Sequence, residues 1–153
     1  MKFKFGLQKV LNHRKIQEDL AQREYLEVFN VLKSQQETLE QILNSIIDTR
    51  EQISRMEVES GAGLLERVNY GHNFIRLQGL RAERQREKIK ETEKLVESKH
   101  EILRQKAMDK KIIERFKEKQ KKQFEAEQIK NQQKELDEIV SMRMNFVKEN
   151  EGS

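Results

Sequence analysis

The hydrophobic residues of the first third of the chain recur at two positions of a seven-residue repeat. One position is apolar at six of seven places between residues 11 and 53, and the other at five of eight places between residues 7 and 56. Two such positions form the seam of a coiled coil. The pattern therefore predicts one long helix over residues 5–58. Its seam positions are Leu11, Glu18, Tyr25, Leu32, Leu39, Ile46 and Ile53, with Leu7, Arg14, Ala21, Val28, Gln35, Ile42, Thr49 and Met56.

A second repeat follows, with a thinner apolar seam. Its apolar members stand seven residues apart at Val68, Ile75, Ala82, Ile89, Val96 and Leu103, whereas the companion positions are polar, at Gln78, Gln85, Thr92 and Lys99. Beyond this stretch we expect the repeat to lengthen from seven to eleven residues, because Ile102, Ile113 and Phe124 stand eleven residues apart. An eleven-residue repeat straightens or reverses the supercoil of a seven-residue repeat. We expect a second helix over residues 65–147.

Glycine separates the two segments. Four of the six glycines lie between residues 61 and 79, and Gly61-Ala62-Gly63 follows Ser60. This tripeptide predicts a turn over residues 59–64. Gly71 and Gly79 weaken a helix by about 1 kcal/mol each relative to alanine, which leaves the helicity of residues 70–80 open.

The charges favour packing of the two helices against each other. Residues 16–59 carry four basic and ten acidic side chains, whereas residues 84–122 carry fifteen basic and eight acidic ones. Opposite net charges favour an antiparallel pair, although each exposed ion pair contributes little. The predicted fold is all-α, an antiparallel coiled-coil hairpin that forms a single elongated domain over residues 1–153. A parallel homodimer of long helices is the alternative.

Composition narrows the function classes. The chain is 38% charged and only 35% hydrophobic, with no Pro and no Cys, which argues against an enclosed pocket, disulfides and thiol catalysis. His13, His72 and His100 lack metal-ligand spacing. We therefore expect no catalytic, cofactor or metal site and no enzyme. Apolar runs of two or three residues predict neither a membrane span nor a signal peptide, and so an intracellular, soluble chain.

The first candidate partner surface is basic. Residues 1–15 carry five basic side chains and no acid, and their expected neighbours, residues 109–122, carry seven basic and three acidic ones. Such a tip would attract an acidic partner, or would merely keep an exposed helix soluble. Its candidate residues are Lys2, Lys4, Lys9, Arg14, Lys15, Lys119 and Lys121.

Two further candidate surfaces are apolar. Tyr70, Phe74, Leu77 and Leu80 lie on one helical face beside the seam, where they either bind a partner or pack against Ile53 and Met56. A turn near residue 62 places residue 1 opposite residue 123, so later residues have no partner in the hairpin. The stripe formed there is a binding face or a dimer seam, and otherwise a frayed tail. It consists of Leu136, Ile139, Val140 and Val147, with Arg143 among them.

Four segments, in order and spread over nearly the whole chain, resemble the flagellar export protein FliJ family. They are Phe3-Lys4-Phe5-Gly6-Leu7-Gln8-Lys9-Val10-Leu11 followed by Arg14 and Glu18; Asn69-Tyr70 with Phe74-Ile75 and Leu77; Glu114-Arg115-Phe116-Lys117-Glu118-Lys119; and Gln133-Lys134-Glu135-Leu136-Asp137-Glu138.

The resemblance implies a two-helix stalk, similar to the central stalk of rotary ATPases. Such a stalk binds the hexameric flagellar export ATPase and the cytoplasmic domain of the membrane export gate protein, and helps to recycle export chaperones. It implies a cytoplasmic protein, peripheral on the inner face of the membrane at the flagellar base. On this interpretation the basic tip contacts the ATPase and the face with Phe74 contacts the gate. The alternatives are the stalk of a virulence-type secretion system, a generic structural coiled coil and a basic nucleic-acid-binding protein.

Overall fold

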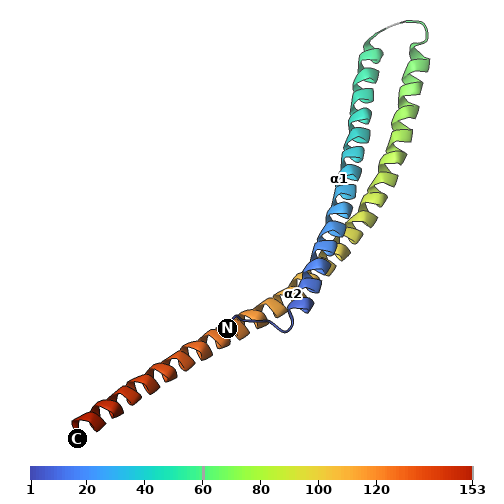
Figure 1. Ribbon diagram of the computed structural model, residues 1–153. Coiled ribbons are helices and arrows are strands. Elements are labelled where there is room, and N and C mark those ends of the chain that lie inside the picture. Colours follow the sequence, from blue (N-terminus) through green and yellow to red (C-terminus); the bar gives the residue numbers. More distant parts are fainter. Residues whose placement is uncertain (60, 153) are drawn as a thin grey trace. The chain divides into compact units, whose positions relative to one another are not determined.

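The computed structural model describes residues 1–59 and 61–152, and these residues form two long helices (Figure 1). Helix α1 spans Gln8–Val58 and helix α2 spans Leu64–Glu151. The described part of the chain contains no strand, so the all-α prediction is confirmed. Helix α1 begins later than the expected residue 5, and α2 continues beyond the expected residue 147.

The connection between the helices uses the predicted glycines. Gly63 has a φ of 81°, in the left-handed region that glycine adopts without a Cβ penalty. Its carbonyl accepts a hydrogen bond from the Arg67 amide at 3.1 Å, as α2 begins. Ser60, which belongs to the expected turn, lies outside the described residues.

The chain divides into two compact units. The turn unit is Glu18–Lys106, and the terminal unit joins Met1–Gln17 to the part of α2 that begins at Ala107. The expectation of a single elongated domain stays a prediction. Each unit has a hydrophobic core of its own, and the two are described separately below.

In the turn unit the two helices pack antiparallel. Proceeding along α1, Glu24 contacts Lys99, Gln35 contacts Gln85, Ser45 contacts Gln78 and Ile53 approaches Gly71. Partner numbers therefore fall along α2 as those along α1 rise. Apolar packing centres on Ile42, Ile46 and Ala82. The predicted α1 seam is confirmed, because every position except Leu7 is buried or half-buried.

The polar companion positions of α2 face this seam too. Gln78 is only 8% exposed, and its Nε2 donates to the Ser45 Oγ at 3.1 Å. Gln85 Nε2 donates a hydrogen bond to the backbone carbonyl oxygen of Gln35 at 2.9 Å. A buried polar group destabilises a fold unless it is hydrogen-bonded. Pairing across the helices is what makes these polar positions compatible with a seam.

The seven-residue spacing of α2 continues past Leu103, so the expected change to eleven residues is wrong over this stretch. Lys110, Lys117 and Phe124 are half-buried, whereas Ile102 is exposed. Lysine can occupy such positions because its four-carbon stem packs against apolar neighbours while the ammonium stays in water.

In the terminal unit an extended segment before α1 packs on α2. Phe5 is buried, and its ring lies 6.0 Å from that of Phe116, while the Phe3 and Phe124 rings are 5.6 Å apart. The Lys117 ammonium lies 5.9 Å from the centre of the Phe5 ring, within cation–π range. Leu11 and Ile113 complete the core with Phe5.

The two glycines inside α2 do not interrupt it, but they differ in surroundings. A Cβ added at Gly71 would lie 2.7 Å from Ile53 Cδ1 and 2.8 Å from its Cγ1, which is closer than van der Waals contact. At Gly79 the same Cβ would meet nothing within 4 Å. Gly71 therefore permits the close approach of Ile53 to α2. At Gly79 no neighbouring atom lies close enough to require a glycine.

We predict that Gly79→Ala stabilises the turn unit by about 0.5–1 kcal/mol, because alanine has the higher helix propensity. Gly71→Ala should not, because its Cβ displaces Ile53. Thermal unfolding followed by circular dichroism measures both, and in the Ile53→Ala background Gly71→Ala should become stabilising. A rise in melting temperature from Gly71→Ala that equals that from Gly79→Ala would contradict the close approach.

We also predict that Phe5→Ala destabilises the terminal unit by about 3 kcal/mol, as expected for truncating a buried aromatic side chain. Hydrogen exchange of amides in residues 107–124 measures the loss. Phe29→Ala is the matched control, because Phe29 is exposed in the turn unit. Unaltered protection in Phe5→Ala would mean that the extended segment contributes no stability.

Candidate partner-binding surfaces

The expected basic tip forms a shallow groove on the terminal unit. Lys4 and Lys121 line it with Lys117 and Gln8, over a floor of Phe3 and Phe5. Gln8 Oε1 accepts a hydrogen bond from Lys117 Nζ at 2.7 Å. Cationic side chains over aromatic rings suit an anionic side chain that brings some apolar surface with it. We call this the basic groove.

The other residues of the expected tip lie outside the groove. Lys2, Lys9, Lys15 and Lys119 are exposed. Arg14 is half-buried and donates from Nη1 to the Asp109 carbonyl at 2.7 Å, so it already joins the two segments of the terminal unit.

Sequence reasoning missed four lining residues of the basic groove: Phe3, Phe5, Gln8 and Lys117. A signal was present, because Phe3 and Phe5 alternate as in an extended segment while Phe116 and Phe124 share one face of a helix. That signal predicts pairing of the aromatic residues and hence the floor of the groove.

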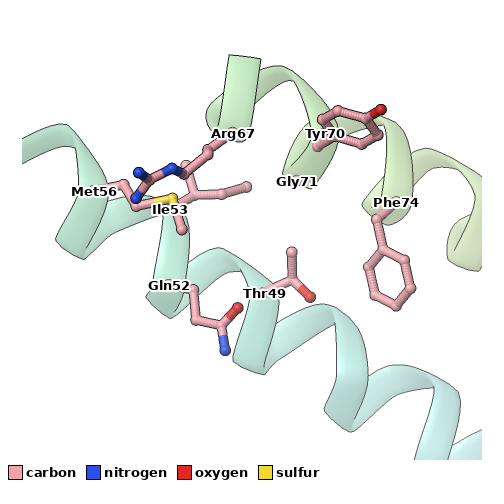
Figure 2. Close-up of a pocket in the computed structure, with 8 residues that line it drawn as sticks. All are labelled: Thr49, Gln52, Ile53, Met56, Arg67, Tyr70, Gly71 and Phe74. Atoms are coloured by element: carbon pink, nitrogen blue, oxygen red, sulfur yellow. The ribbon is translucent and has the colours of Figure 1, made fainter. Parts of the chain in front are cut away.

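The second surface is an apolar groove of about 540 Å³ between the helices of the turn unit. Thr49, Gln52, Ile53 and Met56 line it from α1, and Arg67, Tyr70, Gly71 and Phe74 line it from α2 (Figure 2). Its size is in the range of ligand and side-chain pockets. In its middle Ile53 extends from α1 toward Gly71, into the space that a Cβ would occupy.

Two of the four residues expected on this face come together in the groove. Tyr70 is 79% exposed at its rim, and Phe74 is half-exposed and extends toward α1 (Figure 2). Leu77 and Leu80 are exposed but do not line it. Ile53 and Met56 line the groove together with Phe74. The sequence left open whether the face with Phe74 simply packs against these two residues. Arg67 is the one charged residue among those that line the groove. The sequence did not point to it, because an isolated arginine belongs to no periodic pattern or motif.

The third surface is the apolar stripe near the end of α2. Leu136, Ile139, Val140 and Val147 are each 50–61% exposed. The described residues place nothing over them. Helix α2 includes this stripe. The interpretation of the stripe as a binding face or dimer seam, rather than a frayed tail, stays a prediction.

The described residues hold no cluster of three or more side chains suited to a metal ion. His13 shares a hydrogen bond with Gln17 at 3.0 Å, and the His100 ring lies 5.5 Å from that of Tyr25. Among the helices described, none has the length and apolar character needed to cross a bilayer.

Comparison with known proteins identifies the family. No curated protein and no solved structure matches the chain significantly. The family model described as Flagellar FliJ protein matches residues 3–148, which is nearly the whole chain and includes the turn unit, most of the terminal unit and all three surfaces. The resemblance seen in the sequence is therefore confirmed, and the chain belongs to the FliJ family of flagellar export proteins.

Proposed function

We propose that this protein is the coiled-coil stalk of flagellar type III protein export, bound to the export ATPase ring at one surface and to the membrane export gate at another. Family membership over residues 3–148 is the observation that supports it most. The antiparallel packing of two long helices agrees with a stalk that acts through contacts rather than catalysis. The same proposal includes export chaperone recycling and a position at the inner face of the membrane.

The basic groove is the proposed ATPase contact. Lys4 and Lys121 are exposed on its rim, so their ammonium groups can meet carboxylates of a ring lumen without first breaking an internal ion pair. Lys117 is already held by Gln8 and by the Phe5 ring, and it adds positive potential from a fixed position. Exposed charges of this kind raise the association rate and tolerate small changes of orientation.

The apolar groove is the proposed gate contact. Tyr70 and Phe74 present aromatic surface that is exposed in the free protein, and aromatic anchors dominate the energetics of most interfaces. Arg67 at the same groove offers charge-assisted hydrogen bonds to an acidic group of the gate protein. A short apolar segment with a carboxylate beside it would match both features.

The decisive experiment is a pulldown with purified flagellar export ATPase that also measures ATP hydrolysis. A stalk should bind the ATPase and stimulate hydrolysis. Stimulation of a virulence-type ATPase alone would favour the stalk of that system instead. Retention on immobilised DNA at about 0.15 M salt would favour the nucleic-acid-binding alternative, since binding to phosphates weakens steeply with salt.

We predict that charge reversal in the basic groove weakens ATPase binding. The variant with Lys4→Glu and Lys121→Glu should lose about tenfold in affinity at low salt and show a flatter salt dependence, because exposed charges act mainly through screened attraction. Adding Lys2→Glu and Lys119→Glu should extend the effect.

The matched control reverses two exposed lysines of the turn unit, Lys33→Glu with Lys90→Glu, for the same change in net charge. Titrations across a salt series compare the two double variants. Equal losses in both would mean that net charge alone matters, and unchanged affinity in the groove variant would contradict an electrostatic contact there.

We predict that Phe74→Ala weakens binding to the cytoplasmic domain of the gate protein by about thirtyfold or more, as at an interface hot spot, while the melting temperature stays constant. Leu95→Ala, at an exposed apolar position of the same helix, should leave both unchanged. A lowered melting temperature with intact gate binding would instead show that Phe74 packs the helix pair.

A further inference from the structure

The last part of α2 is a helix that no described residue covers. From Ile129 to Glu151 every side chain is exposed. An isolated helix of this length is marginal in water, because most helical stability in proteins comes from packing of an apolar face. A regular helix with an uncovered apolar face therefore points to a binding partner.

The face is wide and has an ordered arrangement. At about 100° per residue, Ile129, Leu136 and Arg143 form its central row. Ile139 and Phe146 flank this row on one side, with Val140 and Val147 on the other. All six apolar side chains are 50–65% exposed, so little of the face is used within the chain.

We propose that this face pairs with the same face of a second copy of the chain, antiparallel, about a two-fold axis near residues 137 and 138. In that register Leu136 of one copy faces Ile139 and Val140 of the other, and Ile129 faces Phe146 and Val147. Every apolar side chain of the face then meets an apolar side chain. A two-fold interface of this kind is self-complementary, as in most homodimers.

The single charge in the face selects this arrangement. Arg143 faces Gln132 and Gln133 of the second copy, whose amides can accept its hydrogen bonds, and Glu135 stands one helical turn away. A parallel pair in register would set Arg143 against its own copy, and like charges at contact destabilise a helix pair. The antiparallel register could also shift by seven residues in either direction. One shift sets Arg143 against Ile139 of the second copy, and the opposite shift sets Phe146 against Lys122. Each shift places a cation against an apolar side chain.

This inference goes beyond the stalk proposal and does not depend on it. It concerns residues 129–151 alone, whereas the two proposed stalk contacts lie at the basic groove and at the apolar groove. Loss of gate or ATPase binding would leave the pairing intact, and loss of the pairing would leave those contacts intact.

Sedimentation equilibrium of the full chain tests the proposal, with Leu136→Glu compared to Asn145→Glu. Both residues are exposed, but Asn145 lies on the side of the helix opposite the apolar face. The wild-type chain should dimerise with increasing concentration, Leu136→Glu should weaken the dimer at least about thirtyfold, and Asn145→Glu should stay within about twofold. Circular dichroism should show the same turn-unit melting in all three.

Three results would overturn the proposal. The first is a wild-type chain that stays monomeric to about 100 µM, a concentration at which even weak specific complexes form. The second is a dimer that Leu136→Glu leaves intact. The third is a monomeric chain in which Leu136→Glu abolishes ATPase binding. The last would assign the face to the ATPase.

Disulfide cross-linking tests the orientation, since the natural chain has no Cys. Gln132→Cys and Arg143→Cys, each alone, should not cross-link, because each position is about 16 Å from its own copy in the antiparallel pair. A mixture of the two variants should cross-link under mild oxidation. Cross-linking of Gln132→Cys with itself would mean a parallel pair and would overturn the arrangement.

Discussion

The structure depends on an unequal seam between its two helices. Helix α1 presents large apolar side chains at most seam positions, whereas α2 alternates apolar or small side chains with polar ones. Ile42 and Ile46 of α1 pack around Ala82, the most buried residue of α2. Since packing supplies most of the stability of a helix in water, this stretch of α2 relies on α1 for its helical state.

The polar members of the seam determine which residues meet. Hydrogen bonds join Gln78 to Ser45 and Gln85 to the Gln35 carbonyl, and Lys99 pairs with Glu24. Each such bond contributes only about 1 kcal/mol, but a buried polar group left without its partner costs more than that. A slip in register would separate every one of these pairs at once. A thin seam can therefore still specify one pairing.

The three candidate surfaces lie where the regular repeat is interrupted. At Gly71 the side chain of Ile53 approaches the α2 backbone, and the apolar groove lies around this contact. Before Gln8 the chain is not helical, and its aromatic side chains line the basic groove. Beyond Gln128 no described residue covers the apolar face of α2. Interruptions leave apolar or charged surface exposed, and such surface is what another molecule can recognise.

The sequence by itself determined the two helices, the break between them, and the inward face of α1 and of α2 as far as Leu103, because a seven-residue repeat in a chain without proline allows few other structures. It also determined the family and the uncovered stripe, because helical periodicity alone places Leu136 and Val140 on one face. Only the tertiary structure decided that Lys110 and Lys117 continue the seam, since lysine counts as polar in a sequence pattern although its stem packs like an apolar chain. It alone decided that Phe5 packs on Phe116, and that Arg67, Met56 and Phe74 line one groove. Contacts between residues distant in the chain depend on the register of the helices and on the close approach at Gly71, and local spacing in the sequence reveals neither.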